Sequence, residues 1–154
     1  MNNETETIKE LTEYFRRMNK KMTLLKLIMQ AKTEYDKCNF ESGKQSLIEA
    51  YLLDKHNPVT LRGLGCIKQA EGKFNSAIRY FKKALRYSEN KEVEYSLLGM
   101  VYYIQEKLDD AVEYFNLAID CNDSYERAYE GRNQAMLERH LKIVDLQENL
   151  SKRF

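Results

Sequence analysis

The sequence predicts an all-α fold built as a solenoid of helix pairs, and three observations carry this prediction. Apolar residues recur at helical spacing through most of the 154 residues. Glycine and proline are scarce, with 6 Gly and 1 Pro, which argues against the many turns that a β-sandwich or barrel needs. The chain also matches itself when it is shifted by 34 residues. The length fits one domain with one substantial core.

The internal repeat is clearest between residues 58–91 and 92–125, and residues 24–57 follow it more weakly. Each unit has the pattern of two helices, and in the second unit Pro58 begins the first helix and Gly72 separates the pair. Small residues recur where two helices must approach closely, and aromatic residues recur where the space between helices must be filled. The shift aligns, without a gap, Leu64-Gly65 with Leu98-Gly99, Ala77-Ile78 with Ala111-Val112, Tyr80-Phe81 with Tyr114-Phe115, and Ala84-Leu85 with Ala118-Ile119.

This order of small and large residues resembles the tetratricopeptide repeat (TPR) family. The matching residues are Leu64, Gly65, Phe74, Ala77, Phe81 and Ala84 in one repeat, and Leu98, Gly99, Tyr102, Ala111, Phe115 and Ala118 in the next. The usual Trp of the family is replaced by Leu61 and Tyr95, and its closing Pro by Glu89 and Asp123. These departures loosen the turns between repeats without changing the architecture.

The resemblance implies an α-solenoid of three TPR helix pairs with an N-terminal helix and a long C-terminal capping helix. We expect a single TPR domain over residues 1–154. Its expected parts are an N-terminal helix at 1–23, repeats at 24–57, 58–91 and 92–125, and a C-terminal capping helix at 126–154.

The N-terminal segment carries an apolar stripe at alternating spacings of three and four residues. Its members are Ile8, Leu11, Phe15, Met18, Met22, Leu25 and Met29. This heptad pattern predicts one long helix, or two helices in phase. We expect the stripe to cover the exposed edge of the first repeat, which makes residues 5–22 part of the fold. The alternative is a helix–helix seam between two copies of the chain, and the methionines make either contact adaptable.

The C-terminal segment predicts one long helix over roughly residues 125–151, because no Gly or Pro follows Gly131. A cap needs only part of that length. We expect the surplus to be a solubilising overhang with a frayed end. The alternative is a dimer or partner contact made by two apolar stripes of this helix, one with Leu137, Leu141 and Val144 and the other with Leu146, Leu150 and Phe154.

Charge is unevenly distributed although the net charge is only +1. Residues 58–91 contain eight Lys/Arg and two Asp/Glu, whereas residues 92–125 contain one Lys and eight Asp/Glu. Matching columns of the second helices carry opposite charges, Arg79 and Arg86 against Glu113 and Asp120. We expect these charges to support solubility and repeat register. The alternative is an acidic partner on a basic strip that consists of Arg79, Lys82, Lys83 and Arg86; the lack of interleaved aromatics there argues against nucleic acid.

The TPR resemblance implies a concave groove lined by the first helix of each repeat. The groove residues expected from the repeat register are Ile28, Lys32, Tyr35, Arg62, Cys66, Gln69, Ser96, Met100, Tyr103, Glu130 and Gln134. This mixture of aromatic, methionine, amide and charged side chains suits an extended or helical peptide.

We therefore expect a non-enzymatic protein–protein interaction module, an adaptor or a chaperone-like protein, that binds a partner peptide in this groove. The alternative is a structural self-assembly protein that uses its terminal helices or the opposite charges of repeats two and three. Family members that bind heat-shock chaperones use a clamp of Lys, Asn and Arg, of which this chain retains only Lys32. The layout of three repeats between terminal helices also resembles bacterial secretion chaperones, which are typically acidic.

The sequence gives no indication of an active site, a cofactor or a metal. Neither His56 nor His140 has a metal-ligand neighbour four residues on, and no phosphate loop or GxSxG motif occurs. Asp109-Asp110 has the character of a helix start. The three cysteines are expected to be buried reduced thiols. No apolar run approaches the ~20 residues of a membrane span. An acidic start without a signal-peptide pattern indicates a cytoplasmic protein.

Overall fold

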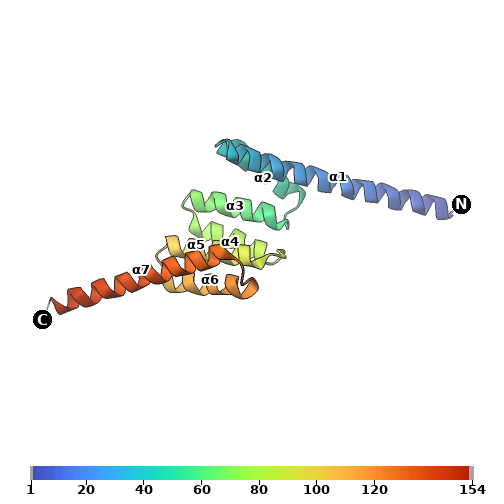
Figure 1. Cartoon of the computed structure of the whole chain (residues 1–154). Helices are drawn as coiled ribbons and strands as arrows, with labels where there is room; N and C mark the ends of the chain where they lie inside the picture. The colour runs from blue at the N-terminus through green and yellow to red at the C-terminus, as the bar shows by residue number, and fades with distance from the viewer. Residues whose placement is uncertain (1, 153–154) are drawn as a thin grey trace. The chain divides into compact units, whose positions relative to one another are not determined.

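The computed structural model of the chain describes residues 2–152. Over these residues it contains seven helices and no strand, which confirms the predicted all-α class (Figure 1). The helices are α1 (Asn2–Asp36), α2 (Phe40–Leu53), α3 (Pro58–Ala70), α4 (Phe74–Leu85), α5 (Lys91–Ile104), α6 (Leu108–Cys121) and α7 (Glu126–Ser151). The chain forms two compact units, one ending at Leu64 and the other beginning at Gly65.

In the first unit, α1 and α2 form a helix pair. Leu24 and Ala31 of α1 are buried, and Ala50 of α2 is fully buried. Gly43 allows α2 to approach Tyr35, because a Cβ atom at Gly43 would lie 2.9 Å from Cδ2 of that ring. The pair is therefore closed by a small residue on one helix and a large one on the other, as the repeat pattern predicts.

The N-terminal apolar stripe is not covered within the described structure, so the prediction that it caps the first repeat is wrong. We call these residues the α1 stripe; they are Ile8, Leu11, Phe15, Met18, Met22, Leu25 and Met29, and their exposed fractions range from 41% to 69%. The reason is that α1 is one unbroken helix. Its first half cannot fold back onto α2, and Figure 1 shows it continuing past the end of α2.

The start of α3 follows from two adjacent residues. Pro58 takes the first helical position, where its missing N–H leaves no hydrogen bond unmade. The side-chain oxygen of Asn57 accepts hydrogen bonds from the backbone N–H of Thr60 at 2.9 Å and from its hydroxyl at 3.1 Å. Asn57 therefore caps the helix, and the buried Thr60 hydroxyl is satisfied.

The core of the second unit is built around two phenylalanines that occupy equivalent repeat positions. Phe81 and Phe115 are both buried, and Ala77, Leu98 and Val101 pack with Phe81 in one cluster. Ala111 and Ala135 pack with Phe115 in the next cluster. The sequence prediction that aromatic residues fill the space between helices is confirmed at these two positions.

Glycines on the neighbouring helices make room for Phe115. A Cβ atom would lie 2.9 Å from its ring at Gly99 and 2.4 Å from it at Gly131. Since real Cβ atoms do not approach so closely, α5 and α7 both depend on glycine to pack against this side chain. Gly131 thus fixes α7 on the second unit in the same way that Gly99 fixes α5.

α7 begins at Glu126 and ends at Ser151, which confirms the predicted long helix. Its first half is held by the buried Ala128, Gly131 and Ala135. Two ion pairs continue the attachment, from Arg139 to Asp109 at 2.8 Å and from Lys142 to Glu106 at 3.0 Å. The final turns of α7 continue beyond Lys142, and their leucines, Leu146 and Leu150, are exposed, as is Leu141 one residue before it. Figure 1 shows this end of α7 running past α6, and Phe154 lies outside the described residues.

The cysteines differ from the prediction. Cys38, Cys66 and Cys121 are all exposed rather than buried. Cys38 lies in the turn after α1, Cys66 on the outward side of α3, and Cys121 in the last turn of α6. These places are helix ends and a helix surface, so no core packing covers them.

None of the helices in the described part of the chain has the combination of length and apolar composition that a membrane-spanning helix requires.

Candidate peptide-binding surface

Four of the predicted groove residues lie in the first unit. Ile28, Lys32 and Tyr35 are on α1, and Arg62 is on α3. Lys32 is exposed, and Ile28 and Arg62 are half-buried. Tyr35 packs edge-on against Phe40, with ring centroids 5.5 Å apart, and also contacts Gly43. Much of the Tyr35 ring therefore serves the α1–α2 pair, which reduces the surface that it can offer to a partner.

The other seven predicted residues lie in the second unit, on three first helices of the repeat pattern. Cys66 and Gln69 are on α3, and Cys66 is exposed. Ser96, Met100 and Tyr103 are on α5. Ser96 is only 9% exposed, so it contributes packing rather than a contact surface. The residues on α7 are Glu130 and Gln134, and both are exposed.

α5 and α7 bring their polar groups together at Tyr103. A hydrogen bond between the Tyr103 hydroxyl and the Glu138 carboxylate raises the pKa of Tyr103 above its ordinary value, and burial adds to the shift. The Gln134 side chain is a second hydrogen-bonding neighbour of the same hydroxyl. The ring itself packs against the cluster around Phe115. Tyr103 thus has its ring against the core cluster and its hydroxyl near the polar side chains of α7.

Two further residues extend this surface along α7. Lys142 lies 3.0 Å from Glu106 and 3.4 Å from Glu138, and the hydrogen bond to Glu106 raises the pKa of the Lys142 amine. Neither Glu138 nor Lys142 was among the residues predicted from the sequence. The signal that could have found them is helical spacing, because Glu130, Gln134, Glu138 and Lys142 follow one another at intervals of four residues.

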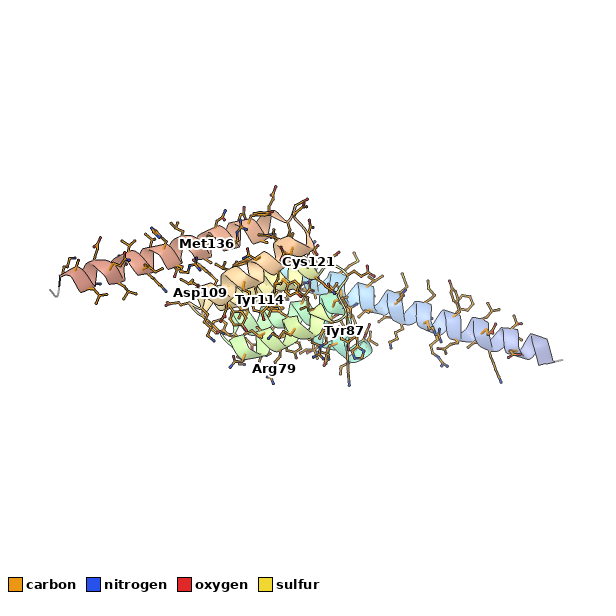
Figure 2. The ribbon with its side chains drawn as sticks, turned by 90° about the horizontal axis from the view of Figure 1, so that it is seen from below. Arg79, Tyr87, Asp109, Tyr114, Cys121 and Met136 are labelled. Atoms are coloured by element: carbon orange, nitrogen blue, oxygen red, sulfur yellow. The ribbon has the colours of Figure 1, made fainter. Side chains whose placement is uncertain are left out.

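We call this set the α5–α7 surface; it consists of Met100, Tyr103, Glu130, Gln134, Glu138 and Lys142. It offers an exposed thioether for apolar contact, an amide that can pair with a peptide backbone, and carboxylates that accept hydrogen bonds. Figure 2 shows the same α7 helix from another side, with Met136 labelled on it and Asp109 at the start of α6. Within the described part of the chain, no group of three or more His, Cys, Asp and Glu side chains could hold a metal ion.

The tetratricopeptide repeat family pattern matches residues 63–91 and 95–129. These two segments cover the helix pairs α3–α4 and α5–α6 and reach the start of α7. Residues 63–129 of this chain are tetratricopeptide repeats. The helices α3 and α5, which are the first helices of these repeats, carry six of the predicted groove residues: Arg62, Cys66, Gln69, Ser96, Met100 and Tyr103.

One curated relative is subunit 7 of the anaphase-promoting complex of Dictyostelium discoideum. It is 29% identical to this TPR chain over 145 residues, which is 94% of this chain and 23% of the relative. The chain therefore spans about a quarter of the length of that protein.

Solved structures share the fold. The O-GlcNAc transferase of Thermobaculum terrenum matches with a TM-score of 0.71 and 16% identity, over 76% of this chain and 22% of that one. The first TPR of Spaghetti (RPAP3), bound to an HSP90 peptide, matches with a TM-score of 0.69 and 14% identity. That match covers 77% of this chain and 94% of the other. At these identities the likeness establishes the TPR solenoid and nothing further.

Proposed function

We propose that this TPR protein is a non-catalytic interaction module that binds a segment of a partner protein on the α5–α7 surface. The observation that carries the proposal is the arrangement around Tyr103. Its hydroxyl lies beside the polar side chains of Glu138 and Gln134, while Met100, three residues earlier on α5, remains exposed. An apolar contact next to hydrogen-bonding groups is the combination that recognises a peptide side chain and its backbone.

Two of the similar proteins support a peptide or protein partner. A TPR of Spaghetti holds a peptide, and the relative from Dictyostelium discoideum is a subunit of a larger complex. An adaptor role within a multi-protein assembly in the cytoplasm fits both. The chaperone peptide itself does not fit, because Ile28, Gly63 and Leu97 occupy positions where the heat-shock clamp has polar side chains.

The test starts from peptides selected on the full chain from a random peptide library. Binding of the selected peptides is then measured by fluorescence anisotropy for the wild type and for the double variant Met100→Ala, Gln134→Ala. Both side chains are exposed, so the variant keeps the fold. We expect the dissociation constant to rise about tenfold or more, which is the effect of removing a central contact.

The matched control is Met136→Ala with Asn133→Ala. These residues are also exposed and lie on α7, but they do not belong to the α5–α7 surface; Figure 2 labels Met136. The control is expected to bind as the wild type does. Peptide binding that survives Met100→Ala, Gln134→Ala unchanged would place the binding site elsewhere on the molecule.

A further inference from the structure

The α1 stripe is the largest set of exposed apolar side chains on one helix of the first unit, and the proposed peptide binding does not use it. Phe15 is 61% exposed and Met22 is 62% exposed. Exposed apolar surface of this extent is rarely left bare on a soluble protein. Apolar residues at heptad spacing pack against a second helix, so the partner that covers the α1 stripe is expected to be helical.

The first unit leaves this side of α1 accessible. α2 packs on the side that contains the buried Leu24 and Ala31. Met22, Leu25 and Met29 lie on the same stretch of helix, yet they remain exposed on another side. A second helix can therefore lie along the α1 stripe without displacing α2.

The charges of α1 indicate which helix that is. Residues 6–13 contain Glu6, Glu10 and Glu13 against the single Lys9. Residues 16–26 contain five basic residues and no acidic one, namely Arg16, Arg17, Lys20, Lys21 and Lys26. Glu13 is engaged by Arg16 and Arg17 of its own helix, at 3.1 Å each. The helix is thus acidic before its midpoint and basic after it, which makes it complementary to itself in the reversed direction.

We propose that two copies of this chain pair through the α1 stripe as an antiparallel coiled coil. Reversal about the midpoint between Arg16 and Arg17 pairs six of the seven residues of the α1 stripe in three kinds of layer. Ile8 meets Leu25 of the second copy, Leu11 meets Met22, and Phe15 meets Met18, while Met29 lies outside these layers. The same reversal sets the acidic residues 6–13 of each copy beside residues 20–27 of the other, which contain three lysines; the three glutamates lie at outer heptad positions, so this attraction acts between segments rather than across the seam.

A parallel pair lacks this complementarity. In that arrangement Lys21 and Lys26 occupy the two flanking positions that face each other across the seam, so like charges meet. The acidic segments would also lie side by side. Charge therefore selects the antiparallel direction, while the apolar stripe supplies the contact in either direction.

The first experiment measures the mass of the full chain by sedimentation equilibrium from about 1 µM to about 1 mM, a range that covers weak and moderate association. We expect a monomer–dimer equilibrium with a limiting mass of twice 18.3 kDa. Phe15→Gln is expected to raise the dissociation constant about tenfold or more. Thr23→Gln introduces the same residue at another exposed position of α1, outside the stripe, and is expected to leave the equilibrium unchanged.

The second experiment tests the direction of pairing by disulfide formation between two variants of the chain, each of which carries a single introduced cysteine. Cys38, Cys66 and Cys121 are replaced by Ser in both, and one chain carries Ile8→Cys while the other carries Leu25→Cys. The antiparallel pair gives a cross-linked product that contains one chain of each kind. Products that join two Ile8→Cys chains would instead indicate a parallel pair and overturn the proposal.

Two other results would also overturn it. One is a chain that remains monomeric over the whole concentration range. The other is a dimer with the same dissociation constant in Phe15→Gln as in the wild type, since its interface would then lie elsewhere, for example on the exposed leucines of α7. Circular dichroism of Phe15→Gln, in which an exposed side chain is replaced by a good helix former, is expected to match the wild type at low concentration.

Discussion

Cys38, Gly72 and Glu106 follow the first helices α1, α3 and α5 at intervals of 34 residues, and all three have a positive φ, of 60°, 71° and 59°. Each turn has the same pair of backbone hydrogen bonds. After α3, for example, the N–H of Gly72 donates to Gln69 and that of Lys73 to Lys68. This is the Schellman helix ending, whose left-handed residue is normally glycine. Only one of the three turns has the residue that this conformation favours.

Substituting glycine in the first of these turns is expected to stabilise the protein. A left-handed conformation costs an ordinary residue about 1–2 kcal/mol, and part of this is offset because glycine loses more entropy on folding. Cys38→Gly should therefore raise the free energy of unfolding by about 0.5–1 kcal/mol in urea denaturation.

The reciprocal substitution, Gly72→Ala, provides the control. A Cβ atom at Gly72 would meet no other atom within 4 Å, so any loss of stability comes from the backbone conformation. We expect a loss of about 1 kcal/mol. A neutral effect in both variants would mean that the turns relax out of the left-handed region.

The environment of Tyr102 predicts how the stability of the folded protein changes at alkaline pH. Its ring stacks on Tyr114, with centroids 5.0 Å apart and planes 7° apart, and burial raises the pKa of its hydroxyl above 10.0. The folded protein therefore holds this proton more tightly than the unfolded chain does. The stability that this difference in pKa gives the folded state is fully present below about pH 10 and is lost as the pH rises through the pKa of the folded protein.

Tyr102→Phe keeps the ring and removes the proton. In thermal denaturation between pH 8 and about pH 11, which brackets tyrosine titration, the wild type is expected to lose stability more steeply than Tyr102→Phe above pH 10. Equal slopes for the two proteins would contradict the assignment.

At the scale of helices, the sequence predicted where each helix pair lies but not what every apolar face contacts. The 34-residue period and the position of Pro58 located α3 to α6, and the absence of Gly and Pro after Gly131 located α7. Heptad spacing, by contrast, shows only that one side of α1 is apolar. Whether that side is covered depends on where the chain turns, and no turn occurs before Asp36.

The α5–α7 surface, too, could be predicted only in part from the sequence. Repeat register placed Met100, Tyr103 and Gln134 on first helices, as observed. It could not show that Ser96 is covered or that Glu138 reaches Tyr103, because both depend on how α5 and α7 pack. The support that the opposite charges of Arg79 and Glu113 give to the repeat register remains a prediction. In the structure, Arg79 donates a hydrogen bond to Ser76 of its own helix at 3.2 Å.

Removal of the first part of α1 tests the revised view of this helix. A chain that starts at Met22 keeps Leu24 and Ala31, which pack in the first unit, and loses most of the α1 stripe. At low protein concentration we expect its free energy of unfolding to lie within about 1 kcal/mol of the full chain, because the removed side chains are mostly exposed.

At high protein concentration only the full chain should gain stability, since pairing through α1 stabilises the folded state by mass action. Differential scanning calorimetry at two concentrations measures both effects. A large loss of stability in the shortened chain at low concentration would show that residues 2–21 contact the rest of their own chain.

For the molecule as a whole, burial predicts an uneven distribution of local stability. Most of the fully buried residues of the second unit lie on α4, α5 and α6, for example Phe81, Leu98 and Ala118. In hydrogen exchange followed by mass spectrometry, the amides of these helices should exchange slowest. Residues 6–23 of α1 and the last turns of α7 should exchange fastest, because none of the described side chains there is buried. Uniform protection along α7 would contradict this order.

The unbroken course of α1 has a consequence for how this segment tolerates changes of length. One helix carries both the face that packs on α2 and the α1 stripe, and each added residue turns everything before it by about 100°. A single-residue insertion near Asn19 would therefore split the stripe into two faces that point in different directions. An insertion of seven residues would restore its phase. Natural length variation before Leu24 is thus expected in steps of seven, whereas loops between the repeats carry no such restriction.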